Sequence, residues 1–310
     1  MDEINIGFIG LGNMGHHMCL AIMESSYNVT VHDINEEAAI PHLELGASWA
    51  DSPKEVAQRC DVIFTSLPGP TEVEVVAAGE DGILDGISSD SVWADLSTSS
   101  PTLIRRLHET FASKGASILD APVSGRRVDQ NGAYLNGVLS IMVGGDENTY
   151  LKLKPVFDSF GESVTYTGEI GSASICKLMN NIFQYSYERI LVESLTLGVK
   201  AGVPAEILVE CIKNGAGGRG HLLNVTLPGS YFQGKFDEVR STFGIAKKDV
   251  ALALELAREY DVPMRTGSDT YDDMTVAANR KEWANLDRTV ALLLQEERAG
   301  NIEVRLPAKD

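Results

Sequence analysis

Residues 4–15 read INIGFIGLGNMG, an apolar run that leads directly into a glycine-rich turn. The run predicts a buried strand over residues 4–9, and the residues after the turn predict a helix over 13–25. In such a turn the first glycine permits tight bending, the second lets the backbone approach a pyrophosphate, and the third allows close helix–strand contact. The helix would direct unpaired N–H groups and its positive dipole end at phosphates. We therefore predict a dinucleotide site at Gly10, Leu11, Gly12, Asn13, Met14 and Gly15.

A carboxylate follows the second predicted strand, residues 29–32. Asp33 stands 18 residues after Gly15, close to the spacing at which an acidic residue accepts hydrogen bonds from an adenosine ribose. A carboxylate there would repel a 2′-phosphate, and neither Ile34 nor Asn35 supplies a cation to hold one. NAD is therefore favoured over NADP as the cofactor. The alternative is an ordinary solvated acid at the end of a strand.

The first half of the chain alternates short apolar runs with polar helical stretches. Most of the runs are continuously apolar, which is typical of strands covered on both faces. Strands are predicted over residues 4–9, 29–32, 62–66, 91–96, 117–120, 140–143 and 164–167, with helices between them that include 13–25, 101–114 and 147–160. The alternation predicts an α/β Rossmann domain with a doubly wound parallel sheet over residues 1–168.

From Gly171 onward the pattern becomes helical. Residues 172–200 form one long helical pattern without proline, and further helices are predicted over 204–213, 246–260 and 288–298. We expect an all-helical second domain over residues 169–310, joined to the first by the long helix. The residues after Gly300 show no periodicity and are expected to be mobile or packed against a partner.

Composition excludes several classes of function. The formal net charge of −18 would repel a phosphate backbone, so we expect no nucleic-acid partner. The chain has no apolar run of the roughly 20 residues that cross a bilayer, and its first residues lack a secretory pattern. The four cysteines lie far apart without metal-type spacing, so we expect them to be free and buried, and we expect no metal. The cytoplasm fits these features.

Two later strand ends are candidates for the cofactor groove, because ligands of open α/β sheets bind beyond the carboxyl ends of the strands. One strand ends in the stretch 65–68 and the other in 96–98, which makes Leu67, Pro68 and Thr98 candidate cofactor contacts. Ordinary turn and cap chemistry before Pro101 is the alternative for Thr98.

A lysine near the start of the long helix is a candidate acid/base. Lys177, Asn181 and Ser174 share one face of the predicted helix. An ammonium in an apolar turn is costly unless it is paired, and the pKa of a lysine falls readily on desolvation, which suits proton transfer. Taken alone, Lys177 could equally be a surface lysine whose stem lies along apolar neighbours.

The motifs occur in an order that resembles the β-hydroxyacid dehydrogenases, a family that includes 3-hydroxyisobutyrate dehydrogenase, tartronate semialdehyde reductase and sulfolactaldehyde reductase. The glycine turn comes first, followed by DAPVSG over residues 120–125, a glycine six residues before Lys177 with Asn181 after it, and finally Lys248-Asp249. The resemblance extends from about residue 4 to residue 298. It implies a Rossmann domain, a helical domain and an active site in the cleft between them.

The resemblance also implies roles for individual residues. Lys177 corresponds to the catalytic acid/base of the family. Ser124 and Gly125 correspond to the loop that binds the substrate carboxylate through hydroxyl and backbone donors. Asn181 corresponds to a residue that orients substrate near the lysine. The chemistry is coherent, because oxidising an alcohol needs a hydride acceptor and a base for the hydroxyl proton.

Two further implications concern the helical domain. Lys248 corresponds to a basic residue that closes the cofactor or substrate side of the cleft, and Asp249 would organise it. The long apolar helix and the family together suggest a homodimer or homotetramer. The expected activity is hydride transfer between NAD and a short β-hydroxyacid or its semialdehyde.

The chain departs from the family after Ser124-Gly125. The loop is longer and more cationic than usual, and Arg126 could hold a second anionic group of the substrate, such as a carboxylate or sulfonate. A solvated surface insertion is the alternative. In the family a glycine- and serine-rich stretch faces the substrate, and the corresponding residues 215–221 make Arg219 and His221 candidates for specificity, although a plain helix connection explains that stretch equally well.

Two other functional classes compete with a hydroxyacid dehydrogenase. Imine reductases share the architecture, but they generally lack a lysine at the position of Lys177. A nucleotide-sensing protein could keep the fold and lose turnover, since a fold does not guarantee chemistry. Lys177 argues against an imine reductase, and the presence of both Lys177 and Asn181 weighs against a sensing protein.

Overall fold

The computed structural model describes residues 4–125, 139–215 and 225–306. The chain divides into two compact units, Met1–Lys177 and Leu178–Asp310. The division falls within the long helix α8 (Ser172–Lys200). The domain boundary predicted at residues 168 and 169 lies just before this helix and stays a prediction.

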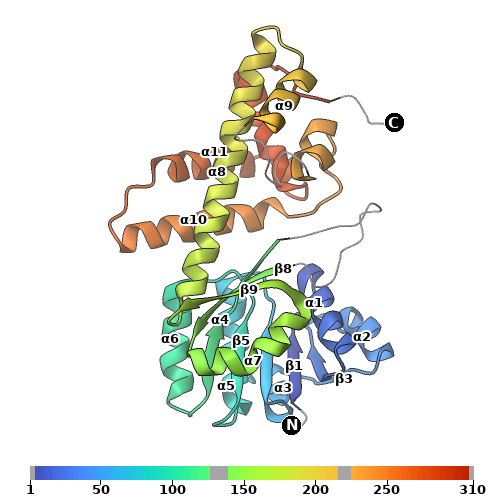
Figure 1. Ribbon diagram of the computed structural model, residues 1–310, viewed down its shortest axis with the longest axis vertical. Helices are drawn as coiled ribbons and strands as arrows, with labels where there is room; N and C mark the ends of the chain where they lie inside the picture. The colour runs from blue at the N-terminus through green and yellow to red at the C-terminus, as the bar shows by residue number, and fades with distance from the viewer. Residues whose placement is uncertain (1–3, 126–138, 216–224, 307–310) are drawn as a thin grey trace. The chain divides into compact units, whose positions relative to one another are not determined.

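Within the described residues, the first unit contains a mostly parallel sheet of nine strands in the order β3-β2-β1-β4-β5-β6-β8-β7, with β9 paired to β8 (Figure 1). The strands are β1 (Asn5–Ile9), β2 (Asn28–His32), β3 (Ser48–Trp49), β4 (Val62–Thr65), β5 (Val92–Asp95), β6 (Ser117–Asp120), β7 (Val123–Ser124), β8 (Leu139–Gly145) and β9 (Gly161–Gly168). The seven predicted strands are present, and β3 and β7 are additional two-residue strands.

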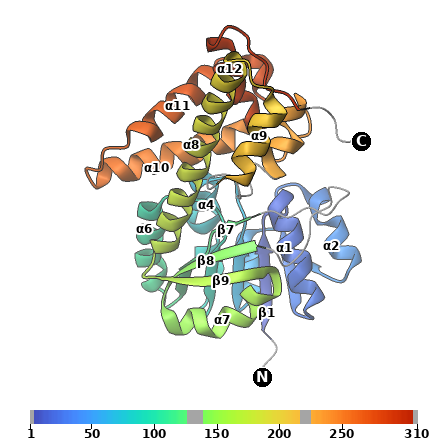
Figure 2. The same ribbon diagram turned by 45° about the horizontal axis from the view of Figure 1, so that its top comes forward.

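The parallel sheet that the sequence predicts is confirmed for β1 to β6, whereas β8 departs from it. The pairs among β1 to β6 are all parallel, but β8 runs antiparallel to both β6 and β7. The chain passes from β6 into β7 in one direction, so β8, which pairs with both, must run against each. Strand β9 then pairs parallel with β8 (Figure 2).

Helices cover both faces of the sheet. They are α1 (Asn13–Glu24), α2 (Ile40–Glu44), α3 (Pro53–Arg59), α4 (Pro70–Ala78), α5 (Ile83–Gly86), α6 (Pro101–Ala112) and α7 (Glu147–Phe160), with a short 3₁₀ helix η1 (Glu36–Ala39). Successive side chains of a strand alternate between two cores: Phe64 lies in the core beneath α1 and α7, whereas Ile63 lies in the core beneath α3 to α6. Burial on both faces explains why the strands read as continuous apolar runs.

Caps explain where two of the predicted helices begin. Helix α6 has Pro101 at its first position and Ser100 as its N-cap, whose hydroxyl accepts from the Leu103 N–H. Helix α7 begins after Asp146, whose Oδ1 accepts from the Thr149 N–H at 2.8 Å. Such side chains satisfy N–H groups that the helix itself leaves unpaired.

The described part of the second unit is helical. Besides the C-terminal part of α8 it contains α9 (Ala205–Asn214), α10 (Phe243–Glu259), α11 (Arg265–Ala278) and α12 (Leu293–Arg298), with 3₁₀ helices η3 (Leu227–Gly229), η4 (Tyr231–Gln233), η5 (Lys281–Trp283) and η6 (Arg288–Leu292). The helix predicted over 288–298 is divided into η6 and α12. Helix α11 has no counterpart among the predicted helices.

Two expectations about this part of the chain are wrong. Residues 301–306, which were expected to be mobile or packed against a partner, contact their own unit: Val304 is buried, and its N–H donates to Glu296 Oε1 at 3.0 Å. The Leu306 N–H donates to the Phe232 carbonyl at 3.1 Å, so the segment packs on its own unit. The cysteines are free, but only Cys19 and Cys60 are buried, since Cys176 and Cys211 lie on exposed helix faces.

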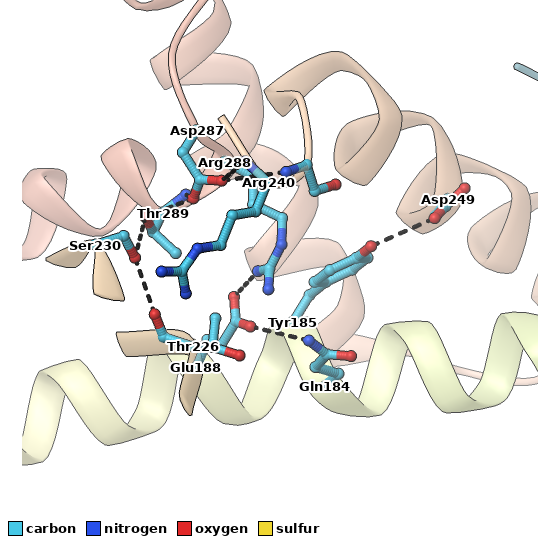
Figure 3. Close-up of polar contacts among 11 residues, drawn as sticks. Gln184, Tyr185, Glu188, Thr226, Ser230, Arg240, Asp249, Asp287, Arg288 and Thr289 are labelled. Atoms are coloured by element: carbon cyan, nitrogen blue, oxygen red, sulfur yellow. Dashed lines mark hydrogen bonds and ion pairs between the residues drawn. The ribbon is translucent and has the colours of Figure 1, made fainter. Parts of the chain in front are cut away.

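A buried ion pair joins α8 to η6 in the second unit (Figure 3). The guanidinium of Arg288 donates to the Glu188 carboxylate, which also accepts from Gln184 Nε2 at 3.3 Å. The Arg288 guanidinium lies over the Tyr185 ring, 5.1 Å from its centroid. Glu188 and Arg288 are both buried, so each charge depends on the other for compensation.

Candidate active site

The glycine turn after β1 has the geometry that its sequence predicts. Gly10 has φ +93°, and a Cβ there would lie 2.3 Å from the Ser66 carbonyl oxygen. A Cβ on Gly15 would lie 1.9 Å from the Gly10 carbonyl oxygen, so the turn and α1 are in close contact. At Gly12 a Cβ would meet no described atom within 4 Å, which leaves the backbone open to a ligand.

The start of α1 suits a bound pyrophosphate. Its N-cap is Gly12, which has no side chain to satisfy the first N–H groups of the helix, and the first turn carries no acidic residue. Gly12 and Asn13 are exposed, whereas Leu11 is buried beneath them. Free N–H groups and the positive end of the helix dipole together favour an anion at this place. The residues therefore fit the phosphates of a dinucleotide.

Asp33 is held at the edge of this turn. Its Oδ2 accepts a hydrogen bond from the Leu11 N–H at 2.6 Å, and its Oδ1 accepts from the Asn35 N–H at 2.8 Å. The side chain is half-buried, and the next residue, Ile34, is 99% exposed. A carboxylate has about four acceptor positions, so two remain for the hydroxyls of a ribose. Asp33 thus orients the glycine turn, and its two remaining acceptor positions fit the ribose of a dinucleotide.

The two candidate loops after β4 and β5 are joined by hydrogen bonds. The Leu67 N–H donates to Ser97 Oγ at 2.9 Å, and the Ser97 N–H donates to Asp95 Oδ1 at 3.1 Å. The Thr65 hydroxyl donates to the same Asp95 oxygen at 2.8 Å. Pro68 is exposed and Thr98 half-buried on the same two loops. The structure therefore brings Leu67, Pro68 and Thr98 to neighbouring strand ends.

Asp95 and Ser97 are the residues of this region that the sequence interpretation missed. Asp95 is buried, and burial raises the pKa of its carboxyl, while hydrogen bonds from Ser97 and Thr65 lower it. The signal in the sequence was the acidic residue at the end of an apolar strand. Without the neighbouring strand nothing showed that it would bond to the loop of residues 65–68.

Ser124 and Gly125, which the resemblance predicts to bind the substrate, lie at the end of β7. Ser124 pairs with Ser140 of β8, and its side chain is half-buried. Gly125 is exposed and has φ +98°, a conformation that residues with a Cβ rarely adopt. An exposed backbone turn of this kind can direct N–H groups at a carboxylate. Arg126, Arg219 and His221 lie outside the described residues.

Lys177 and Asn181 lie one turn apart on α8, as the spacing predicts. Lys177 is half-buried and Asn181 is buried. The Asn181 amide is oriented by Asp249 of α10, because its Nδ2 donates to Asp249 Oδ2 at 2.8 Å. The carboxamide oxygen of Asn181 is consequently directed away from Asp249 and accepts from Asn180 Nδ2 at 3.2 Å.

Asp249 is the centre of a buried cluster that also contains Tyr185 and Lys248. It is 2% exposed, and its Oδ2 also accepts from the Tyr185 hydroxyl at 3.3 Å (Figure 3). The Lys248 Nζ lies 2.9 Å from its Oδ1. Burial, aided by the charge of Asp249, raises the pKa of Tyr185 above its ordinary value, so the phenol stays a hydrogen-bond donor. The sequence did not indicate Tyr185, because an aromatic residue in a long helix is typical of a core.

The described residues contain neither a metal-binding cluster of acidic, His and Cys side chains nor a helix suited to a membrane. In the described ranges, no three or more His, Cys, Asp or Glu side chains lie together in a way that could hold a metal ion. Among the helices that the structure describes, none combines the length and apolar character needed to span a membrane.

Comparisons with known proteins agree with this geometry. The model of the NAD binding domain of 6-phosphogluconate dehydrogenase matches residues 5–168, and the NAD-binding model of NADP-dependent 3-hydroxyisobutyrate dehydrogenase matches residues 171–294. The chain is 33% identical to 2-(hydroxymethyl)glutarate dehydrogenase of Eubacterium barkeri, over 84% of this chain and 85% of that protein. It is 33% identical to 3-hydroxyisobutyrate dehydrogenase of Pseudomonas aeruginosa, over 69% of this chain and 70% of that protein.

A solved structure shows the same architecture. A 3-hydroxyisobutyrate dehydrogenase of Mycobacterium tuberculosis, determined with L-serine, superposes with a TM-score of 0.81 at 25% identity, over 94% of this chain and 98% of that one. The two family models together cover most of the chain, and the relatives match it over most of their own lengths. The chain therefore belongs to the β-hydroxyacid dehydrogenase family and is a nicotinamide-dependent hydroxyacid dehydrogenase.

Proposed function

We propose that the protein transfers hydride between NAD and a short β-hydroxyacid or its semialdehyde, with Lys177 as the general acid/base. The observation that carries this proposal is the fixed amide of Asn181, one helical turn from Lys177. A buried amide whose nitrogen is occupied by Asp249 has one defined orientation, which suits a residue that orients substrate beside the lysine.

The proton transfer follows from the chemistry of a lysine. The bound nicotinamide supplies the hydride acceptor for oxidation of an alcohol. Neutral Lys177 Nζ takes the hydroxyl proton of the substrate as the carbonyl forms. In the opposite direction the ammonium form of Lys177 polarises the carbonyl and returns the proton to the oxygen.

The substrate carboxylate is assigned to Ser124 and Gly125. A hydroxyl and exposed backbone N–H groups at the end of β7 supply donors suited to an anion. The names of the relatives, 2-(hydroxymethyl)glutarate dehydrogenase and 3-hydroxyisobutyrate dehydrogenase, support a hydroxyacid substrate. Because glutarate is a dicarboxylate, the first name also supports a substrate with a second anionic group. Arg126 and His221 are the residues that the sequence proposes for that group.

The preference for NAD rests on Asp33. Its carboxylate is held by Leu11 and Asn35 with acceptor positions to spare, and a 2′-phosphate beside it would meet a like charge. The side chain that follows, Ile34, is apolar and 99% exposed. We assign Lys248, which Asp249 holds, to the cofactor as well.

Helix α8 supports a homodimer or homotetramer. Phe183, Ile190 and Leu197 recur every seven residues on this helix and are 71%, 52% and 70% exposed. Apolar side chains at this spacing share one helix face, and a second helix of the same kind can cover it. Light scattering on the wild type and on a Phe183→Glu, Leu197→Glu variant tests the assignment, which a monomeric wild type would refute.

The activity is tested with a panel of short hydroxyacids and hydroxysulfonates, assayed with NAD and NADP by the absorbance of the reduced cofactor. Lys177→Ala should reduce turnover to a small residual rate while binding of the reduced cofactor, followed by fluorescence, is retained. Lys154→Ala is the matched control, since Lys154 pairs with Asp158 on the exposed face of α7. A Lys177→Ala enzyme with near-normal kcat would refute the role of the lysine.

A further inference from the structure

The start of α8 is held by a buried carboxylate from a distant strand. Asp120 ends β6 and is 1% exposed. Its Oδ1 accepts a hydrogen bond from the Gly171 N–H at 2.8 Å. Its Oδ2 accepts from the Ser174 N–H at 2.7 Å and from the Ser174 hydroxyl at 2.9 Å. Both oxygens of Asp120 are therefore used by the first turn of the helix that carries Lys177.

These two N–H groups are the ones that many helices satisfy with their own side chains. In a capping box, the side chain of the N-cap residue accepts from the third helical N–H, and the third side chain reaches back to the N-cap N–H. Gly171 is in the N-cap position before Ser172 and has no side chain. Its φ of +86° favours glycine there. Asp120, 51 residues earlier, supplies both bonds in place of a local cap.

The surrounding backbone leaves room for this carboxylate and little more. A Cβ on Gly144 would lie 2.5 Å from Asp120 Oδ1 and 2.7 Å from Ser172 Oγ. The Ser172 hydroxyl is hydrogen-bonded to the Thr167 hydroxyl at 2.8 Å, and Thr167 donates to the Val143 carbonyl at 3.1 Å. The first residues of α8 are thus fixed to β6, β8 and β9 together.

Asp120 also begins the segment that leads to Ser124 and Gly125. The next residue, Ala121, is held by its N–H, which donates to the Asp95 carbonyl at 2.7 Å. On the other side, Lys177 follows Ser174 by three residues, about 4.5 Å along the helix axis. One carboxylate therefore connects the beginning of the substrate segment with the turn that precedes the lysine.

We propose that Asp120 is a positioning residue for the reaction, which fixes the height and rotation of the first turn of α8 and so sets the place of Lys177 Nζ relative to residues 121–125. This inference rests on the proposed role of Lys177. Burial raises the pKa of Asp120, and the hydrogen bonds from Ser174 and Gly171 oppose that effect. Misplacement of a reacting group by about 1 Å can cost on the order of 100-fold in rate, so a small shift of the helix start would be visible in kcat.

The test compares Asp120→Asn with two other variants. Asparagine keeps one acceptor oxygen and presents an amide nitrogen to a donor on the other side, so part of the cap is lost. Ser174→Ala removes only the hydroxyl bond. Asp146→Asn is the matched control, because Asp146 caps α7 through the Thr149 N–H and hydroxyl at 2.8 and 2.7 Å.

We expect Asp120→Asn to lower kcat by at least about 10-fold with the cofactor KM within about 2-fold of wild type. Ser174→Ala should show a smaller loss, and Asp146→Asn none.

A double-mutant comparison separates positioning from general damage. If Asp120 acts through Lys177, Asp120→Asn should lower the residual turnover of Lys177→Ala by less than about 2-fold. An equal loss of rate in both backgrounds would overturn the inference, as would a normal kcat for Asp120→Asn. Should Asp120→Asn fail to fold, Ser174→Ala decides, because an unchanged kcat there also overturns it. Normal turnover by Lys177→Ala alone would instead refute the proposed function.

Discussion

Replacing Asp249 by asparagine removes the charge at the centre of the cluster that orients Asn181. The carboxylate is 2% exposed and has three partners: Asn181 Nδ2 at 2.8 Å, the Tyr185 hydroxyl at 3.3 Å and Lys248 Nζ at 2.9 Å. Asparagine has one acceptor oxygen, so it cannot serve Lys248 and the other two partners together. Its amide nitrogen would then face either an ammonium or another donor.

The magnitude follows from the bonds that are lost. A hydrogen bond to a charged group contributes about 1.5–3 kcal/mol, and part of it remains when one oxygen is kept. We expect the free energy of unfolding to fall by about 2 kcal/mol, which corresponds to a urea midpoint lower by roughly 1 M for an m-value near 2 kcal/mol/M. Because Asn181 loses its single defined orientation, kcat/KM for the hydroxyacid should fall by about 10-fold.

Urea unfolding followed by circular dichroism and steady-state kinetics at saturating cofactor measure the two effects. Asp273→Asn is the control in the same unit, since Asp273 bonds to Arg298 at 2.5 Å and to Arg189 at 3.0 Å near the surface. Its effect on stability should stay below about 1 kcal/mol, with turnover unchanged. If Asp249→Asn unfolds at the urea concentration of the wild type and keeps its kcat/KM, the cluster neither stabilises the unit nor orients the amide.

Three further predictions concern the cofactor, the buried ion pair and pH. Asp33→Ala should raise the KM for NAD at least about 10-fold, because the ribose of NAD loses its hydrogen-bond acceptor. The KM for NADP should rise much less, because the 2′-phosphate also loses a repelling charge. An unchanged ratio of kcat/KM for the two cofactors would contradict the assignment. Arg288→Met should lower the free energy of unfolding by about 3–5 kcal/mol, because Glu188 is left charged and buried. Urea unfolding measures the change in this free energy, and adding Glu188→Leu to the Arg288→Met chain should restore part of the loss. Burial, followed by the charges of His42 and His17, lowers the pKa of His16 below its ordinary 6.5. The unfolded chain therefore takes up the proton first, so thermal stability should fall as the pH drops below about 6.5, and His16→Asn should flatten that dependence, whereas an unchanged slope would rule out this histidine as its source.

Local patterns were sufficient to predict the elements that we propose bind the cofactor. The glycine turn at residues 10–15 needs φ values and close approaches that only glycine tolerates, so its sequence predicts its geometry. The starts of α6 and α7 also depend on local contacts, because Ser100 and Asp146 each accept a hydrogen bond from the backbone N–H three residues later. The spacing of Lys177 and Asn181 placed them on one face of α8 because four residues make about one helical turn.

Long-range contacts could not be predicted in the same way. The direction of β8 depends on its pairing with β6 and β7, and its own apolar run would suit a parallel or an antiparallel strand. The packing of residues 301–306 depends on Glu296 and Phe232, and the segment itself has no periodicity. Helix α11 was not predicted either; in the structure it packs against α10.

The family and the proposed chemistry thus follow from short motifs, each of which encodes its geometry within a few residues. The arrangement of their side chains depends on carboxylates far away in the chain: Asp120 bonds to Gly171 across 51 residues, and Asp249 to Asn181 across 68. An acidic residue at the end of an apolar strand looks the same in sequence whether it faces solvent or caps a distant helix. Its partner becomes evident only when the sheet and helices have been packed, because burial makes an unsatisfied carboxylate costly and so selects the donors that it binds.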